Sequence, residues 1–287
     1  MTDYLHPMEG NSDVLWRYGK VAPCLNNFLK WKEIASKIIG KDFVVLKRWT
    51  KLTPLFIQDM NEIDEDFLKL RSDKHLDEVK DKLTVKQILI WQYFVPRKLI
   101  NFFYATNNEF GNKIDRIFID IDRQNSSSNE AQKVACELNK VIKSDSWFPL
   151  KHKILNLWTW SSFHVYLMLE KNIDNKFYEK YLSYGPKKNE SFIMKRAEQI
   201  SKVTKLNVLA DHERKKDALI LDSSNTPPWK LARCPFSLHI KNAETIDGVC
   251  LPVSEKELED LNLIKKLEKI TLDEVWENIW KYKDMLN

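Results

Sequence analysis

The spacing of hydrophobic positions predicts mostly helix over the first third of the chain. Residues 25–40 place apolar side chains three and four apart and stop at Gly40, which is typical of an amphipathic helix with a glycine terminus. Residues 61–95 also have a helical pattern, in which Thr84 occupies the position of an N-cap and Pro96 ends the segment. The first third is therefore expected to be helical, ahead of any sheet.

Strand patterns begin after that region. Residues 98–106 are rich in β-branched and aromatic side chains, and residues 114–121 alternate with period two. Other strand candidates are short apolar runs further along the chain: residues 154–160, 163–170, 206–211 and 218–222.

Helices are expected between and after these strands. One is capped by Ser127 or Ser128, and residues 174–205 form two pieces broken near Gly185 and Pro186. Two more begin at cap residues in the tail, Ser254 and Thr271. Strands in the middle, with helices before, between and after them, predict an α+β (mixed α/β) fold.

Composition excludes two broad classes. Hydrophobic residues make up 43% and charged residues 30% of the 287 positions, which argues against a disordered chain. No apolar run approaches the ~18 residues of a membrane-spanning helix, and the first residues show no secretory signal pattern, so a cytoplasmic protein is expected. The cysteines form no CxxC pair and lack histidines at zinc spacing, which predicts reduced thiols and no structural zinc: Cys24, Cys136, Cys234 and Cys250.

Basic residues are concentrated in one part of the chain. The formal net charge is +5, from 46 basic and 41 acidic residues. Residues 151–245 hold 17 Lys and Arg against 10 Asp and Glu, and the rest of the chain holds 29 against 31. This distribution favours an anionic partner, although a solvated lysine-rich face explains it equally well.

Two acidic residues lie at the end of the alternating strand pattern. Residues two apart share one face of a strand, so Asp120 and Asp122 would present two carboxylates about 7 Å apart along it. Like charges at that separation repel, and a divalent cation on the carboxylate oxygens removes the conflict. The alternative is that the strand ends at Asp120 and both acids lie in a solvated turn.

Further polar residues follow the later strand patterns. Ser162 and His164 lie between two apolar runs, where a hydroxyl and an imidazole can donate hydrogen bonds to phosphate; a satisfied core histidine is the alternative. Asp222 ends an apolar run and suits a third carboxylate near a cation, with Asp211 as its rival.

Three side chains that suit phosphate lie within nine positions after residue 232. Arg233 can bind phosphate through two hydrogen bonds at once, whereas Lys241 acts as a point charge and His239 as an imidazole donor. Pro235 stiffens the backbone between them. Ordinary surface charge is the alternative for each residue taken alone.

The order of these motifs resembles the archaeo-eukaryotic primase superfamily, which includes primase catalytic subunits and primase-polymerases. That family shows a strand with DxD, a small-x-His motif, and a hydrophobic-Asp strand followed by an R-x-P-x-S-L-H segment. Here the motifs read IFIDID, SFH, LILD and RCPFSLH, and the resemblance covers about residues 98–253. The 11 positions from Asp222 to Arg233 suit the family spacing and favour Asp222 over Asp211.

The resemblance implies an architecture. The family has an RNA-recognition-motif-like sheet, a second α/β portion, and an active-site cleft between them. By analogy, residues 98–253 would be the catalytic core. Residues 1–97 would be a mainly helical region packed on it, and residues 254–287 would be C-terminal helices.

The resemblance also assigns residues. Three acids match the catalytic, metal-binding positions of the family: Asp120, Asp122 and Asp222. The nucleotide-binding positions are matched by hydroxyl, imidazole and basic side chains: Ser162, His164, Arg233, His239 and, with a looser match, Lys241.

The activity implied is template-directed nucleotidyl transfer by a DNA primase or primase-polymerase of DNA replication. Such an enzyme joins NTPs or dNTPs on a single-stranded DNA template, using two Mg²⁺ or Mn²⁺ ions. Basic residues between positions 187 and 216 would bind the template backbone. The partners that this activity implies include a helicase or another replication protein, and a membrane is not expected.

The chain departs from the family pattern in places, and other functions stay open. Trp160, Ser161 and Ser162 stand where many members have a Gly-rich loop, and Ile-Lys-Asn-Ala follows SLH in place of Gly-Lys-Thr-Gly. One alternative is a non-catalytic primase accessory subunit or a single-strand nucleic-acid-binding subunit; the three acids on apolar strands argue against it, because such a subunit does not need them. Another alternative is a metal-dependent nuclease, and the RCPFSLH segment argues against that function, because a nuclease does not need it.

Overall fold

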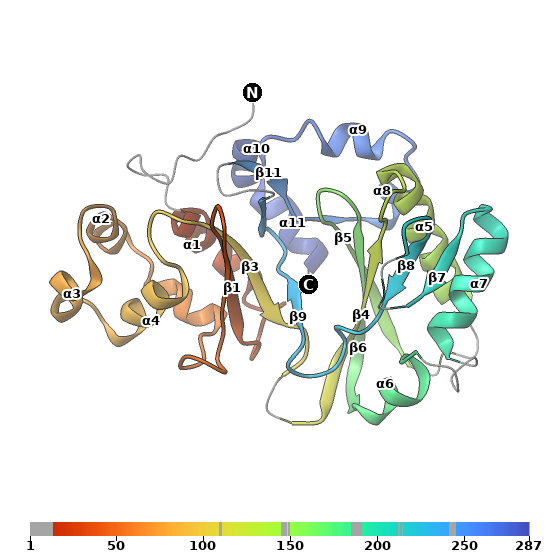
Figure 1. Cartoon of the computed structure of the whole chain (residues 1–287), viewed down its shortest axis with the longest axis horizontal. Coiled ribbons are helices and arrows are strands. Elements are labelled where there is room, and N and C mark those ends of the chain that lie inside the picture. The colour runs from red at the N-terminus through yellow and green to blue at the C-terminus, as the bar shows by residue number, and fades with distance from the viewer. Residues whose placement is uncertain are drawn as a thin grey trace. The chain divides into compact units, whose positions relative to one another are not determined.

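The computed structural model describes residues 14–108, 111–144, 148, 150–184, 191–211, 213, 215–240 and 245–286 (Figure 1). The chain forms two compact units. Unit 1 comprises Met1–Ala105, Leu231–Cys250 and Ile270–Asn287. Unit 2 comprises Thr106–Lys230 and Leu251–Lys269. Each unit therefore combines stretches that lie far apart in the sequence.

Unit 1 contains a four-stranded antiparallel sheet in the order β2-β1-β3-β9 and a separate antiparallel pair of β10 and β11. Its strands are β1 Ile34–Ile39, β2 Val44–Lys47, β3 Leu99–Ala105, β9 Leu231–Arg233, β10 Leu238–Ile240 and β11 Ile246–Val249. Its helices are α1 Val14–Leu25, η1 Ile57–Glu62, α2 Glu65–Asp73, α3 Leu76–Val79, η2 Lys80–Lys82, α4 Val85–Tyr93, α10 Leu272–Glu277 and α11 Ile279–Leu286.

The helix predicted over residues 25–40 is wrong. α1 ends at Leu25, and after a turn the chain enters β1, which pairs with both β2 and β3. The run Ile34–Ile39 is short, and a short apolar run satisfies helical spacing and a strand buried on both faces equally well. Pairing with two neighbouring strands decides between the two structures, and no local pattern reveals that pairing.

Unit 2 contains a six-stranded sheet in the order β12-β5-β6-β4-β8-β7, in which only β7 and β8 run parallel. Its strands are β4 Lys113–Asp122, β5 His152–Trp158, β6 Phe163–Asp174, β7 Val208–Ala210, β8 Leu219–Asp222 and β12 Leu251–Val253. Its helices are α5 Ser128–Ser144, α6 Lys176–Tyr181, α7 Phe192–Thr204, α8 Glu255–Leu258 and α9 Leu263–Leu267. The α+β class predicted from the sequence is confirmed.

β4 is central to this sheet, and its two faces differ. Ile117, Ile119 and Ile121 are completely buried, and α5 contacts both β4 and β6. Successive side chains of a strand point to opposite faces, so the even-numbered Asp120 and Asp122 lie on the other face of β4. Both are partly exposed there. The period-two pattern of residues 114–121 therefore reflects a strand with one apolar face and one acidic end.

Helix starts predicted from sequence are confirmed where a cap residue is followed by an acid or amide three positions later. In each case the cap oxygen accepts the backbone N–H of the third residue, and that residue's side chain accepts the N–H of the cap. The pairs are Thr84 with Gln87, Ser127 with Glu130, Ser254 with Glu257 and Thr271 with Glu274.

None of the helices within the described ranges combines the length and the apolar character that crossing a membrane would require.

Candidate active site

Four of the predicted residues lie together on one face of the sheet in unit 2. In the strand register, Asp120 of β4 is opposite His164 of β6 on one side and opposite Asp222 of β8 on the other. Asp122 follows two positions later on the same face of β4. Directly opposed residues in antiparallel strands have Cβ atoms about 5 Å apart, so the register brings Asp120 and Asp222 close together.

His164 is held beside Asp120 in a mostly buried position. Its Nε2 lies 3.5 Å from Asp120 Oδ1, and its side chain is 9% exposed against 34% for that of Asp120. Its ring packs edge-on against Phe118, with centroids 4.8 Å apart. The imidazole is therefore fixed by the sheet, while the carboxylate beside it stays accessible to a ligand.

Asp222 is held by a hydrogen-bond network at the end of β8. Its Oδ1 accepts the Tyr184 hydroxyl at 2.8 Å and the Ser224 N–H at 2.7 Å. Burial raises the pKa of the Tyr184 hydroxyl, and the neighbouring Asp222 carboxylate raises this pKa further. The phenol therefore stays protonated at neutral pH and donates a hydrogen bond to Asp222.

Ser162 ties the SFH motif to the strand that carries the acids. Its buried hydroxyl donates to the Ile121 carbonyl, which lies between Asp120 and Asp122 in the sequence. Its own carbonyl accepts the N–H and the hydroxyl of Thr159. The hydroxyl of Ser162 is thus directed at the β4 backbone, and the motif supports the geometry of the acidic pair.

Asp211 lies away from this row of residues. It follows β7, a strand that pairs with β8 and has no register with β4. Its Oδ2 lies 2.9 Å from Lys215 Nζ, in a local ion pair. Of the two acids, Asp222 is therefore the one in register with Asp120 within the described strands.

The RCPFSLH segment belongs to unit 1, where it forms β9, a tight turn and β10. Arg233 Nη1 donates to the Leu238 carbonyl at 2.8 Å, and its guanidinium carbon lies 5.4 Å from the centroid of the Phe103 ring. His239 Nδ1 lies 3.3 Å from Asp247 Oδ2 on β11. Arg233 and His239 are thus neighbours within the unit, whereas Lys241 lies outside the described residues.

Buried hydrogen bonds hold that turn in place. Tyr18 of α1 donates its hydroxyl to the Ile100 carbonyl at 2.6 Å and accepts the Leu238 N–H at 3.2 Å. The Ser237 hydroxyl accepts the Phe102 N–H at 2.9 Å, and Phe236 has a positive φ of 64°. The serine of SLH is therefore structural, and the motif is fixed to β3 and α1.

Replacing Tyr18 with phenylalanine should lower the free energy of unfolding by about 1–3 kcal/mol. The change keeps the ring but leaves a buried carbonyl and a buried N–H without the phenol that joins them. Urea unfolding followed by circular dichroism measures the loss. Tyr181→Phe, in α6 of the other unit, should change stability by less than about 0.5 kcal/mol. Equal stabilities of the two variants would contradict the role given to Tyr18.

Alkaline pH should destabilise the fold through the tyrosines near Asp222. Burial, and then the Asp222 carboxylate, raise the pKa of Tyr178 from 10.0 to about 12. The folded chain holds this proton more tightly than the unfolded chain, so stability is retained below about pH 10 and falls as pH rises toward 12. Urea midpoints at about pH 8 and about pH 11 test the effect. The drop between them should be smaller in Tyr178→Phe.

The acidic pair suits a divalent cation that brings ligands of its own. Carboxylate oxygens of Asp120 and Asp122 are the hard donors that Mg²⁺ and Mn²⁺ take. Among the described residues, no group of three His, Cys, Asp or Glu side chains is arranged to enclose a metal ion. Mg²⁺ is commonly held by one or two carboxylates together with substrate phosphates and water, so an open pair of acids fits it.

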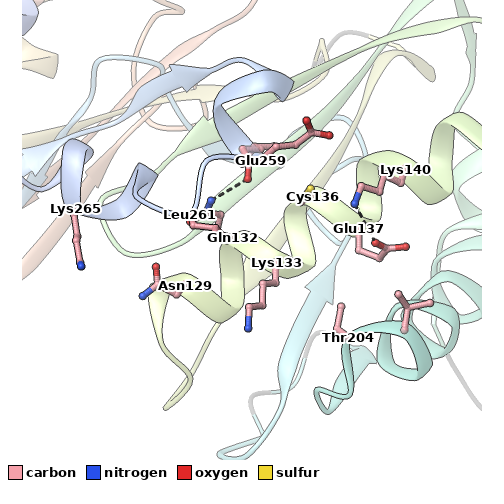
Figure 2. Close-up of a pocket in the computed structure, with 12 residues that line it drawn as sticks. Asn129, Gln132, Lys133, Cys136, Glu137, Lys140, Thr204, Glu259, Leu261 and Lys265 are labelled. Carbon is pink, nitrogen blue, oxygen red and sulfur yellow. Dashed lines mark hydrogen bonds and ion pairs between the residues drawn. The ribbon is translucent and has the colours of Figure 1, made fainter.

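A pocket of about 650 Å³ lies elsewhere in unit 2 (Figure 2). Residues along one side of α5 line it together with the C-terminal end of α7 and the α8–α9 segment: Asn129, Gln132, Lys133, Cys136, Glu137, Lys140, Val203, Thr204, Leu258, Glu259, Leu261 and Lys265. No residue of the DxD, SFH or LILD motifs is among them. The candidate active site is therefore defined by the residues that lie opposite one another in the sheet, and not by this pocket.

Sequence reasoning missed two residues that contact the predicted site residues. Tyr184 donates a hydrogen bond to Asp222, and the Asp247 carboxylate contacts the imidazole of His239. Neither belongs to a motif, and Tyr184 precedes residues outside the described ranges. No sequence signal identifies either residue, because each contact depends on chain segments brought together by the fold.

Comparison with known proteins adds a structural match. No protein-family model matches the chain, and no curated protein matches its sequence. Among solved structures, the chain is similar to the polymerase domain from Mycobacterium tuberculosis ligase D in complex with DNA. The two are 14% identical, and the match covers 96% of this chain and 90% of that chain with a TM-score of 0.62. The match shows that the chain shares the fold of that polymerase domain, in agreement with the α+β architecture expected from the sequence.

Proposed function

We propose that this chain is a template-directed nucleotidyltransferase, a DNA primase or primase-polymerase, acting on single-stranded DNA. One observation carries the proposal: Asp120 and Asp122 share a face of β4, with Asp222 directly opposite Asp120. Three acids placed together on a sheet are costly unless a cation or a substrate uses them. The fold match supports the proposal, because the similar structure is a polymerase domain in complex with DNA.

Asp120 and Asp122 would hold the divalent ions, and Asp222 would complete the acidic group. Bound Mg²⁺ or Mn²⁺ supplies Lewis-acid chemistry, which lowers the pKa of a coordinated hydroxyl and neutralises phosphate charge. The protein's part is to keep the carboxylates fixed. Ser162 does so through the β4 backbone, and Tyr184 does so through Asp222.

The reaction joins a 3′-hydroxyl oxygen to the α-phosphorus of a nucleoside triphosphate. The bond from that phosphorus to the bridging oxygen breaks, pyrophosphate leaves, and the hydroxyl proton passes to solvent. Arg233 and His239 would bind the triphosphate oxygens, because a guanidinium and an imidazole both donate hydrogen bonds to phosphate. His164 Nε2, beside Asp120, would donate to a phosphate oxygen next to the acids.

The template would be bound through charge on unit 2. Lys195 and Lys216 are exposed in the basic part of the sequence, and Trp229 is 49% exposed. Lysines of this kind bind phosphates without regard to sequence, and an exposed indole can stack on a base. Template affinity would therefore fall as the salt concentration rises.

A primer-synthesis assay tests the proposed function. Labelled NTPs and dNTPs are supplied separately with single-stranded DNA, with and without an annealed primer, in Mg²⁺ and in Mn²⁺. Products are resolved on a denaturing gel. New product on unprimed DNA indicates a primase, and extension of a primer alone indicates a polymerase.

The same assay separates the remaining alternatives. Shortening of the labelled DNA without use of nucleotides would indicate a nuclease. Binding of single-stranded DNA without any product, under every combination of nucleotide, primer and metal ion, would replace the proposal with a non-catalytic accessory or single-strand-binding subunit.

A further inference from the structure

Tyr184 lies directly beside the acid that ends β8. Its hydroxyl donates to Asp222 Oδ1 at 2.8 Å and accepts the N–H of Ser223. The Ser223 hydroxyl is 3.0 Å from both the Tyr184 oxygen and the Leu182 carbonyl. Several hydrogen bonds therefore hold the segment that carries Tyr184 against the end of β8, and they orient the phenol hydroxyl toward Asp222.

Both donors to the Asp222 carboxylate use the same oxygen. Tyr184 and the Ser224 N–H bind Oδ1, and within the described part of the chain no donor contacts Oδ2. Two donors on one oxygen fix the plane of the carboxylate. Oδ2 is then the oxygen available to a cation or a water molecule.

Asp222 needs this restraint because of its neighbour. It lies opposite Asp120 in the strand register, and two like charges directly opposed destabilise a sheet. Without a second partner on Oδ1, the carboxylate would turn away from Asp120. The phenol stabilises the charge of Asp222 and opposes that rotation.

We propose that Tyr184 is a positioning residue that presents Oδ2 of Asp222 to a divalent cation shared with Asp120. The inference rests on the proposed function for the identity of the substrate, but its metal-binding part can be measured separately. Hydrogen-bond partners of ligating carboxylates contribute about 10–100-fold to metal affinity or activity. We therefore expect the Tyr184 hydroxyl to strengthen Mn²⁺ binding by about 10–100-fold.

The test is a titration of the full chain with Mn²⁺ alone, in which free Mn²⁺ is measured by electron paramagnetic resonance. Tyr184→Phe keeps the ring and removes the donor, and Asp222→Asn removes the ligand charge. Tyr181→Phe is the matched control, three positions earlier in the chain. Tyr184→Phe should weaken one class of Mn²⁺ site by about 10-fold or more, as should Asp222→Asn, while Tyr181→Phe should bind like the unmodified chain.

Kinetics supply a second readout. In Tyr184→Phe the Mn²⁺ concentration for half-maximal nucleotide incorporation should rise by about 10-fold, and the rate at saturating Mn²⁺ should largely recover. A purely structural role would instead lower the melting temperature and leave the metal dependence unchanged. If Tyr184→Phe does not fold, Ser223→Ala is the substitute variant. It removes the hydroxyl that contacts the Tyr184 oxygen, and it should weaken Mn²⁺ binding by a smaller factor than that expected for Tyr184→Phe.

Two results would overturn the assignment: Mn²⁺ affinity of folded Tyr184→Phe equal to that of the unmodified chain, or no Mn²⁺ binding by the unmodified chain. A different pattern separates this inference from the proposed function. If Mn²⁺ binding depends on Tyr184 while no nucleotide is incorporated, Tyr184 keeps its role and the polymerase proposal fails.

Discussion

Replacing Asp120 and Asp122 together by asparagine should reduce nucleotide incorporation by at least about 10³-fold. The reason is geometric. Both residues lie on one face of β4, next to Asp222, and asparagine keeps their shape while removing the charge that attracts a divalent cation. The gel assay with labelled nucleotides measures the loss. Asp217→Asn, at an exposed turn before β8, is the matched control and should retain full activity.

The same double variant should fold at least as well as the unmodified chain. Asp120 faces Asp222 across the β4–β8 pair, so removing charge relieves repulsion and the melting temperature should stay the same or rise. Loss of activity with unchanged or increased stability would separate catalysis from folding. Retained activity in the folded double variant would refute the assignment of these acids to the metal site.

Arg233→Ala should raise the KM for the nucleotide by about 10–100-fold, because a charge-assisted hydrogen bond to phosphate contributes roughly 1.5–3 kcal/mol. Affinity for single-stranded DNA should change by less than about threefold, since one phosphate contact among many is a small share of template binding. Steady-state kinetics and fluorescence anisotropy with labelled DNA measure the two effects. The reverse pattern would make Arg233 a DNA contact.

Two further variants control this experiment. Arg233 also donates to the Leu238 carbonyl, so thermal unfolding must show that the β9–β10 turn survives its loss. Arg233→Lys keeps the charge but not the planar pair of donors, and should recover only part of the nucleotide affinity. Lys69→Ala removes an exposed charge from α2 of the same unit and should leave KM unchanged.

Local chemistry explains which elements could be predicted. β4 follows from its alternation, and the helix after Ser127 follows from its cap, because both signals lie within a few residues. β1 could not be predicted from the same kind of signal. Its six residues suit a helix as well as a strand, and pairing with β3, whose partner residues lie 60 to 70 positions later, determines the outcome.

Local sequence signals identify the residues of the candidate site but not their arrangement. The motifs bring attention to Asp120, His164 and Asp222 one at a time, and resemblance to a family links them. Their placement in one row depends on the pairing of β4 with β6 and with β8, which joins residues 120 and 222 across about a hundred positions. Tyr184 depends on that pairing as well, so no local pattern could reveal it.

The interleaved composition of the two units has a consequence for synthesis on the ribosome. The chain passes between the units at 105/106, 230/231, 250/251 and 269/270. Unit 2 can be completed once residue 269 has emerged, whereas unit 1 needs α10 and α11, whose contacts with α1 join the two ends of the described chain. α1 therefore finds all of these partners only after α10 and α11 have been made. For the same reason, no single cut yields two autonomous fragments, and a library of C-terminal deletions would damage the RCPFSLH-bearing unit before the acidic one.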